Sequence, residues 1–136
     1  MVSDLTNIEH LKKSGKKIVF TNGCFDVLHV AHIRLLEQAK KSGDCLIIGI
    51  NTDASVQRLK GPNRPYYTLS ERIEILEALK VVDGVIPFDE DTPLNLIQKI
   101  KPDVLVKGGD YKKDQIVGSK EVKSWGGKVL IFPYIE

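Results

Sequence analysis

The sequence predicts an α/β fold in which one doubly wound, five-stranded parallel sheet is covered by helices. Two observations lead to this prediction. Short apolar segments alternate with amphipathic segments along the 136 residues, which is typical of βαβ units with right-handed crossovers. The apolar segments are rich in β-branched residues and nearly continuous in apolar character, as expected for strands that are buried on both faces.

We expect a single domain, because the length suits one domain and no repeat, low-complexity stretch or linker interrupts the chain. Within residues 1–136, we assign residues 1–15 to an N-terminal helix and residues 16–136 to the α/β core. The five strands are predicted at residues 17–21, 45–50, 84–88, 104–107 and 128–132.

The amphipathic segments between the strands are predicted to form the helices. After the N-terminal helix near residues 5–13, helices are expected at residues 30–42, from residue 68, from residue 92 to just before Pro102, and at residues 118–125. Thr68 and Glu71 have the spacing of a capping box at a helix start. Thr92 and Pro93 offer an N-cap followed by a proline at the first helical position.

Charge and composition narrow the class of protein. The net charge is only +2, so no nucleic-acid partner is expected. The longest apolar runs, residues 46–50 and 129–132, are too short to cross a bilayer, and residues 1–10 lack the apolar core of a secretory signal. Cys24 and Cys45 do not make a disulfide framework. We therefore expect reduced cysteines, a cytoplasmic location and no membrane partner.

Two histidines follow the first predicted strand, where a doubly wound sheet binds its ligands. His29 and His32 are three residues apart at a predicted helix start, so both rings lie on one side of the first turn. The free N–H groups and the positive dipole end there favour an anion such as phosphate. Neither the P-loop pattern GxxxxGK[ST] nor GxGxxG is present.

The histidine pair could also arise by chance or mark a zinc site. Zinc would need further cysteine or histidine ligands. Cys24, Cys45 and His10 are not arranged in a recognisable metal motif, so we assign no metal ligands.

The segment GCFDVLHVAH, residues 23–32, resembles the (H/T)xGH signature of the cytidylyltransferase-like nucleotidyltransferases. Other segments resemble the D-glycero-D-manno-heptose 1-phosphate adenylyltransferases of lipopolysaccharide assembly. These segments are NTDASVQRLKGPNRP (51–65), ERIEIL (71–76), FDEDTPLNLI (88–97), KPDVLVKGGDY (101–111) and IVG (116–118). The resemblance covers the chain from about residue 16 to residue 136, and KGGDY is its most specific part.

This resemblance implies a Rossmann-like sheet of the nucleotidyltransferase type. It also implies that the protein is an enzyme that transfers AMP from ATP to heptose 1-phosphate, giving ADP-heptose and pyrophosphate. The small-molecule substrate is then a sugar phosphate, and Mg²⁺ is expected because pyrophosphate is a highly charged leaving group. A homodimer is a further expectation from the superfamily.

The resemblance implies roles for individual residues. His29 and His32 are expected to contact the phosphates of the nucleotide, and Lys60 to neutralise the α-phosphate or the substrate phosphate. Further nucleotide contacts are expected from Thr21, Asn22, Gly23, Cys24, Phe25, Lys107, Gly108 and Asp110. Substrate binding is assigned to Asp26, Asn51 and Arg72.

Several of these residues also have a purely structural interpretation. The alternative for Lys60 is an exposed position in a loop, and the alternative for Asp26 is a turn before the helix. Arg72 stands in the first turn of a predicted helix, where an acidic residue would suit the dipole better. A ligand phosphate or a surface ion pair would account for it. For Gly108 and Gly109 the alternative is a plain turn.

Two features depart from the family pattern. Ala31 stands where the family has glycine, so its methyl group is expected to lie close to the nucleotide. The resemblance also implies a G-x-S-T-type segment after the last strand that contacts the triphosphate, whereas the sequence ends at Glu136.

Three other functions stay open at this point. The chain could be a cytidylyltransferase for glycerol 3-phosphate or another pyrophosphorylase. It could also be a nucleotide-binding domain without catalysis, or a βαβ interaction module. Pyrophosphate release with different nucleotides and acceptors separates these possibilities.

Overall fold

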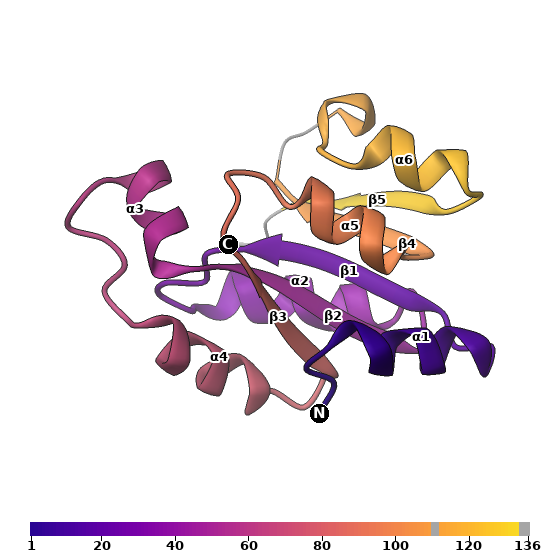
Figure 1. Ribbon diagram of the computed structural model, residues 1–136, viewed down its shortest axis with the longest axis horizontal. Helices are drawn as coiled ribbons and strands as arrows, with labels where there is room; N and C mark the ends of the chain where they lie inside the picture. The colour runs from indigo at the N-terminus through magenta and orange to yellow at the C-terminus, as the bar shows by residue number, and fades with distance from the viewer. Residues whose placement is uncertain (110–111, 134–136) are drawn as a thin grey trace.

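The computed structural model describes residues 1–109 and 112–133 and contains one sheet of parallel strands (Figure 1). The strands are β1 (Ile18–Gly23), β2 (Cys45–Asn51), β3 (Gly84–Phe88), β4 (Val104–Gly108) and β5 (Lys128–Phe132). The helices are α1 (Leu5–Lys13), α2 (Val30–Lys40), α3 (Asp53–Lys60), α4 (Leu69–Glu77), α5 (Leu94–Ile100), the 3-10 helix η1 (Lys113–Gln115) and α6 (Ser119–Ser124). The predicted α/β fold with a five-stranded parallel sheet is confirmed.

The sheet has its topological switch at β1, because the strand order is β3-β2-β1-β4-β5. From β1 the chain moves outward to β2 and β3, and it then returns to the other side of β1 to form β4 and β5. The register pairs Gly23 of β1 with Ile50 of β2, and Phe20 of β1 with Leu105 of β4. Ligands of doubly wound sheets bind at such a switch, beyond the carboxyl ends of the strands.

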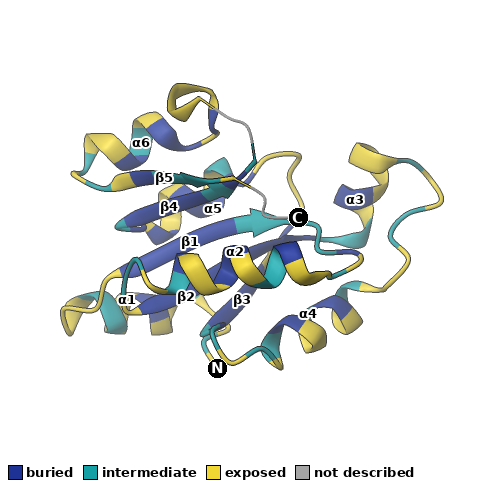
Figure 2. Ribbon diagram, turned by 180° about the vertical axis from the view of Figure 1, so that it is seen from behind, coloured by how far each residue is buried: buried dark blue, intermediate teal, exposed yellow. Residues whose placement is uncertain are grey.

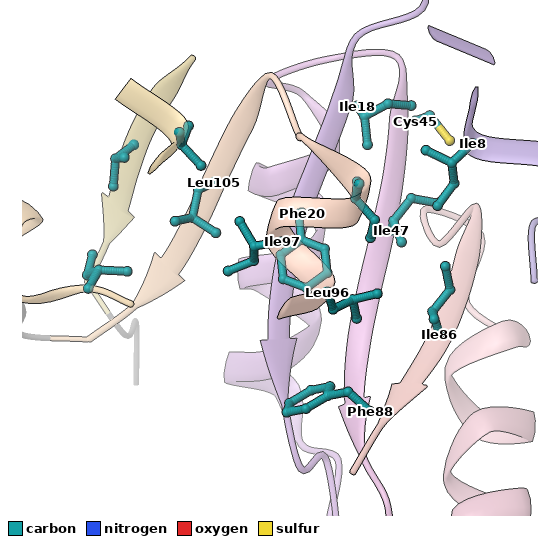
Figure 3. Close-up of a cluster of buried hydrophobic side chains, with 14 residues drawn as sticks. Ile8, Ile18, Phe20, Cys45, Ile47, Ile86, Phe88, Leu96, Ile97 and Leu105 are labelled. Carbon is teal, nitrogen blue, oxygen red and sulfur yellow. The ribbon is translucent and has the colours of Figure 1, made fainter. Parts of the chain in front are cut away.

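Successive strand residues bury two apolar layers, one on each face of the sheet. On one face Phe20 of β1 packs with Leu96 and Ile97 of α5, and α1 and α6 contribute to the same layer (Figure 3). Val19 belongs to the opposite layer, which α2 and α4 cover (Figure 2). The strands are therefore buried on both faces, as their continuous apolar character predicts.

The helix starts follow the predicted capping chemistry at α4. The N–H of Glu71 donates to Thr68 Oγ1 at 3.2 Å, and the N–H of Thr68 donates to Glu71 Oε1 at 2.9 Å. This reciprocal pair satisfies two N–H groups that a helix start leaves without partners. None of the helices in the described ranges is long and apolar enough to cross a membrane.

Helix α3 was not predicted from the sequence. Thr52 is its N-cap and accepts a hydrogen bond from the N–H of Ser55 at 3.3 Å. Because only Ser55 and Val56 are buried in this helix, it lacks the apolar periodicity on which helix prediction depends. Lys60 is consequently the last residue of a helix, whereas the structural alternative for this residue placed it in a loop.

Helix α1 is fastened to the end of α5 by one lysine. Lys12 Nζ donates to the carbonyl oxygen of Ile100 at 3.0 Å and also to that of Lys101. These carbonyls end α5, where backbone acceptors lack helical partners and the dipole favours a cation. The ammonium group therefore acts as a C-terminal cap supplied from another helix.

We expect Lys12→Met to lower the free energy of unfolding by about 1–2 kcal/mol, because the two carbonyls lose a charged donor. Lys13→Met is the matched control, since Lys13 is an exposed neighbour on the same helix. Urea unfolding of both variants checks this. Equal stability of the two variants would contradict the capping role of Lys12.

Candidate active site

A cavity of about 290 Å³ lies beyond the carboxyl ends of β1 and β4, at the switch in strand order. Its lining residues are Thr21, Asn22, Gly23, Cys24, Phe25, Asp26, Val27, His29, His32, Leu35, Lys60, Arg64, Lys107 and Gly108. Most of the predicted nucleotide residues therefore lie around one cavity. Asp110, the other residue predicted to contact the nucleotide, falls outside the described residues.

The two histidines hold the start of α2 together. His29 is the N-cap, and its Nδ1 accepts the N–H of Ala31 at 3.2 Å. The Nδ1 atom of His32 accepts the N–H of His29, also at 3.2 Å. A neutral imidazole that accepts at Nδ1 carries its proton at Nε2. Each ring is therefore set to donate an N–H group from Nε2, and both rings line the cavity.

His32 is held in its neutral form. Burial lowers the pKa of His32 below 6.5, and the nearby charges of His29 and Lys60 lower it further. The two imidazole rings lie 4.2 Å apart between centroids. The rings of Phe25 and His32 pack edge to face, with a centroid distance of 5.5 Å and an interplanar angle of 67°. This packing fixes the orientation of the His32 ring at the cavity.

Phe25 adopts a left-handed backbone conformation, with φ of 47°, which is uncommon for a bulky residue. Its ring lies against Gly23, where an added Cβ would be only 2.9 Å from Phe25 Cε2. A side chain at position 23 would therefore have to displace the ring that packs on His32. The backbone conformation of Phe25 and the glycine at position 23 thus allow the Phe25 ring to pack on His32.

Neither Arg72 nor Asn51, both predicted to bind the substrate, is among the residues that line the cavity. The side chain of Arg72 is fully buried. It donates to the carbonyl oxygens of Cys24 (2.9 Å), Asn51 (2.8 Å) and Tyr67 (3.0 Å), and to Asp53 Oδ1 (2.8 Å). Intramolecular acceptors, and not a ligand phosphate, account for an arginine in the first turn of α4.

Asn51 is buried as well, and its amide group forms hydrogen bonds to Ser55 and to Cys24, which lines the cavity. Asn51 Nδ2 donates to Ser55 Oγ at 3.0 Å, while its Oδ1 accepts from Cys24 Sγ at 3.6 Å.

Ala31 does not line the cavity either. It borders a smaller hollow together with Phe132 and Pro133, so its methyl group does not narrow the space between the histidines and Lys60.

Asp26 and Arg64 form an ion pair at the cavity wall, with Arg64 Nε 2.7 Å from Asp26 Oδ2. Asp26 also accepts the backbone N–H groups of Tyr66 and Tyr67. Arg64 was not predicted from the sequence, because an arginine in a loop belongs to no periodic pattern. The sequence feature that could have indicated Arg64 is its place in a loop close to Lys60 and between Pro62 and Pro65.

Basic groups from three segments surround the cavity. Lys60 ends α3, Lys107 belongs to β4, and the histidines begin α2. Burial lowers the pKa of Lys107, although the nearby Cys24 opposes this shift. The described residues contain no group of three histidine, cysteine, aspartate or glutamate side chains that could hold a metal ion. Chemically, this is a site for anions with several charges.

Comparison with known proteins identifies the family. The sequence profile described as cytidylyltransferase-like matches residues 20–132. The chain belongs to the cytidylyltransferase-like family. This result confirms the resemblance drawn from residues 23–32 and the assignment to the nucleotidyltransferases.

Curated relatives of the cytidylyltransferase-like chain include the bifunctional protein HldE of two bacteria. The protein of Methylobacillus flagellatus is 53% identical over 131 residues, which are 96% of this chain and 27% of that protein. The protein of Geobacter metallireducens is 55% identical over 129 residues, which are 95% of this chain and 26% of that protein. The chain thus spans about a quarter of the length of these relatives.

Two solved structures share the fold. The lipopolysaccharide core biosynthesis protein of Thermoplasma volcanium is 28% identical with a TM-score of 0.72, and the match covers 90% of this chain and 98% of that protein. Pantoate-beta-alanine ligase of Francisella tularensis is 20% identical with a TM-score of 0.61, covering 97% of this chain and 66% of that chain. At 20% identity, the second match supports the fold alone.

We expect Arg72→Met to destabilise the cytidylyltransferase-like chain by about 3–5 kcal/mol. The substitution leaves three carbonyl oxygens without their charged donor in a buried region. Arg58→Met is the control, because the Arg58 side chain is 45% exposed and forms an ion pair with Asp91, so its loss should cost about 1 kcal/mol or less. Urea unfolding measures both variants, and similar losses would refute the central role of Arg72.

Acid should weaken the fold through His32. Since the folded chain lowers the pKa of His32, the unfolded chain binds the proton first as the pH falls through about 6.5. The contribution of His32 to the free energy of unfolding is therefore complete above this pH and is lost below it. Between pH 7.5 and pH 5.5 the native chain should lose more stability than His32→Gln. Equal losses in urea unfolding would show that His32 is not the titrating group.

Proposed function

We propose that this chain transfers AMP from ATP to D-glycero-D-manno-heptose 1-phosphate, giving ADP-heptose and pyrophosphate. The observation that carries the proposal is the histidine pair, which offers two Nε2 donors to an anion in a basic cavity at the sheet switch. Support for the acceptor comes from the resemblance over residues 51–118. The HldE relatives and the lipopolysaccharide core biosynthesis protein add to this support.

The chemistry requires no nucleophile from the protein. An oxygen of the sugar phosphate attacks the α-phosphorus of ATP, the bond from that phosphorus to the bridging oxygen breaks, and pyrophosphate leaves with the bond electrons. Positioning and charge stabilisation then supply the catalysis. His29 and His32 donate to phosphate oxygens as negative charge grows on them, and Lys60 and Lys107 supply positive charge on either side.

A second cavity, of about 180 Å³, adjoins the first and shares Asn22 and Lys107 with it. Its other lining residues are Asp91, Thr92, Pro93, Gln115, Ile116 and Val117. The apolar part suits a flat aromatic base, and the polar part suits its edge and the ribose. We assign the nucleoside end of ATP to this cavity, with the triphosphate entering the first.

Mg²⁺ enters this proposal as part of the nucleotide substrate. Magnesium is commonly held by substrate phosphates and one or two carboxylates, and not by a complete protein cage. We place the enzyme in the cytoplasm, where ATP is available and both cysteines stay reduced.

The test is pyrophosphate release in the presence of Mg²⁺, with ATP, CTP and GTP each paired with heptose 1-phosphate and with glycerol 3-phosphate. We expect release with ATP and heptose 1-phosphate. Release with CTP and glycerol 3-phosphate would instead establish the cytidylyltransferase alternative. ATP binding without release from any pair would establish a nucleotide-binding domain without this activity.

His32→Ala provides the site control for this assay. Loss of one donor to the developing charge should lower turnover by about 10²–10³-fold. His10→Ala is the matched variant, because His10 is an exposed residue of α1 outside both cavities, and its turnover should be unchanged. Normal turnover of His32→Ala would remove the basis of the site assignment.

A further inference from the structure

We infer that Arg64 binds the phosphate of the acceptor sugar, with Asp26 and Tyr66 as positioning residues that aim its guanidinium group. This inference rests on the proposed function and deepens it, because it separates an acceptor-phosphate subsite from the triphosphate subsite.

The guanidinium group of Arg64 contacts Asp26 and Tyr66, and its two terminal nitrogens are available to bind a ligand. Its Nε donates to Asp26 Oδ2 at 2.7 Å, and its Cζ lies 4.5 Å from the centroid of the Tyr66 ring. Within residues 1–109 and 112–133, neither terminal nitrogen of Arg64 has a hydrogen-bond acceptor. The side chain is 27% exposed and lines the cavity. A planar fork with both terminal nitrogens available matches two phosphate oxygens.

Asp26 orients this fork and does not itself bind an anion. Its side chain is only 1% exposed. It accepts the N–H groups of Tyr66 at 2.8 Å and Tyr67 at 3.0 Å in addition to the Arg64 bond. Burial alone would raise the pKa of Asp26, but the bonds from Tyr67, Tyr66 and Arg64 outweigh burial and lower it. The carboxylate is thus a fixed negative charge with its oxygens occupied.

The location of Arg64 separates it from the nucleotide end of the cavity. Lys107 is part of β4 and borders the second cavity, which we assign to the nucleoside. Lys60 and Arg64 belong to the segment after β2, on the other side of β1. Helices α3 and α6 accordingly lie at opposite sides of the molecule in both views (Figures 1 and 2).

An in-line displacement places the incoming and leaving oxygens on opposite sides of the α-phosphorus. The incoming sugar phosphate therefore needs its own cationic site, apart from the site of the departing pyrophosphate. With the histidines after β1 in the middle and the nucleoside on the β4 side, the β2 side is left for the acceptor. Arg64 is the residue there whose donors are directed by protein contacts and still available.

The test compares Arg64→Gln with the native chain in two measurements, the KM for heptose 1-phosphate and the KM for ATP. Loss of a charge-assisted, two-pronged contact should raise the KM for the sugar phosphate by about 10–100-fold. The KM for ATP should change by less than about threefold. Lys41→Gln is the matched control, since Lys41 is an exposed cation that lines neither cavity, and both of its KM values should stay as in the native chain.

Asp26→Asn tests the positioning role. Asparagine keeps an oxygen that accepts the Tyr67 N–H, but it removes the charge that aims Arg64. The KM for the sugar phosphate should rise by about 3–10-fold, while the KM for ATP stays constant. A purely structural role would lower thermal stability and raise both KM values together, and that result would overturn the positioning role.

Two outcomes overturn the assignment of Arg64. Equal rises in both KM values would place Arg64 at the triphosphate, and unchanged values would remove it from the site. Failure of the proposed function is a different result, namely no pyrophosphate release by the native chain. In that case binding of inorganic phosphate, in the presence of a non-hydrolysable ATP analogue, is compared for the native chain and Arg64→Gln. At least tenfold weaker binding by the variant would support the anion site, and equal binding would refute it.

Discussion

The buried guanidinium group of Arg72 is the contact on which the architecture of the site depends. A buried charge is costly unless its donors find acceptors, and Arg72 finds them in four separate segments. These segments are the loop after β1, the end of β2, the start of α3 and the turn before α4. One side chain thereby fixes the relative positions of the segments that carry the histidines, Lys60 and Arg64.

The histidines combine a structural and a chemical task. A helix start leaves N–H groups without partners, and here the Nδ1 atoms of His29 and His32 satisfy two N–H groups at the start of α2. The same bonds determine that Nε2 carries the proton in each neutral ring. Burial and the neighbouring cations then keep the pKa of His32 low, so the ring contributes a directed N–H donor without adding charge to a basic cavity.

Periodic segments of the chain were more predictable from the sequence than isolated polar residues. The five strands and the capping box at Thr68 and Glu71 were predicted because apolar runs and cap patterns are local. Helix α3 was missed because it buries little apolar surface. The histidines and Lys60 were placed at the cavity, whereas Arg72 was assigned to a ligand. Its position in a first helical turn is unusual, but three of its four acceptors come from residues 19 to 48 positions away along the chain.

The sequence by itself determined the fold class, the family and the segment after β1 as the place of the chemistry. Local patterns carry this information, since apolar periodicity sets the elements and the residues between Gly23 and His32 set the motif. Only the tertiary structure decided which polar side chains line the cavity and which form the intramolecular hydrogen bonds that hold its walls in place. Asp26, Asn51 and Arg72 were all predicted to bind the substrate, but each side chain is hydrogen-bonded to backbone or side-chain groups of the protein itself. Arg64 could be recognised as a candidate ligand-binding residue only from the tertiary structure, in which Asp26, 38 residues away along the chain, accepts a hydrogen bond from its Nε.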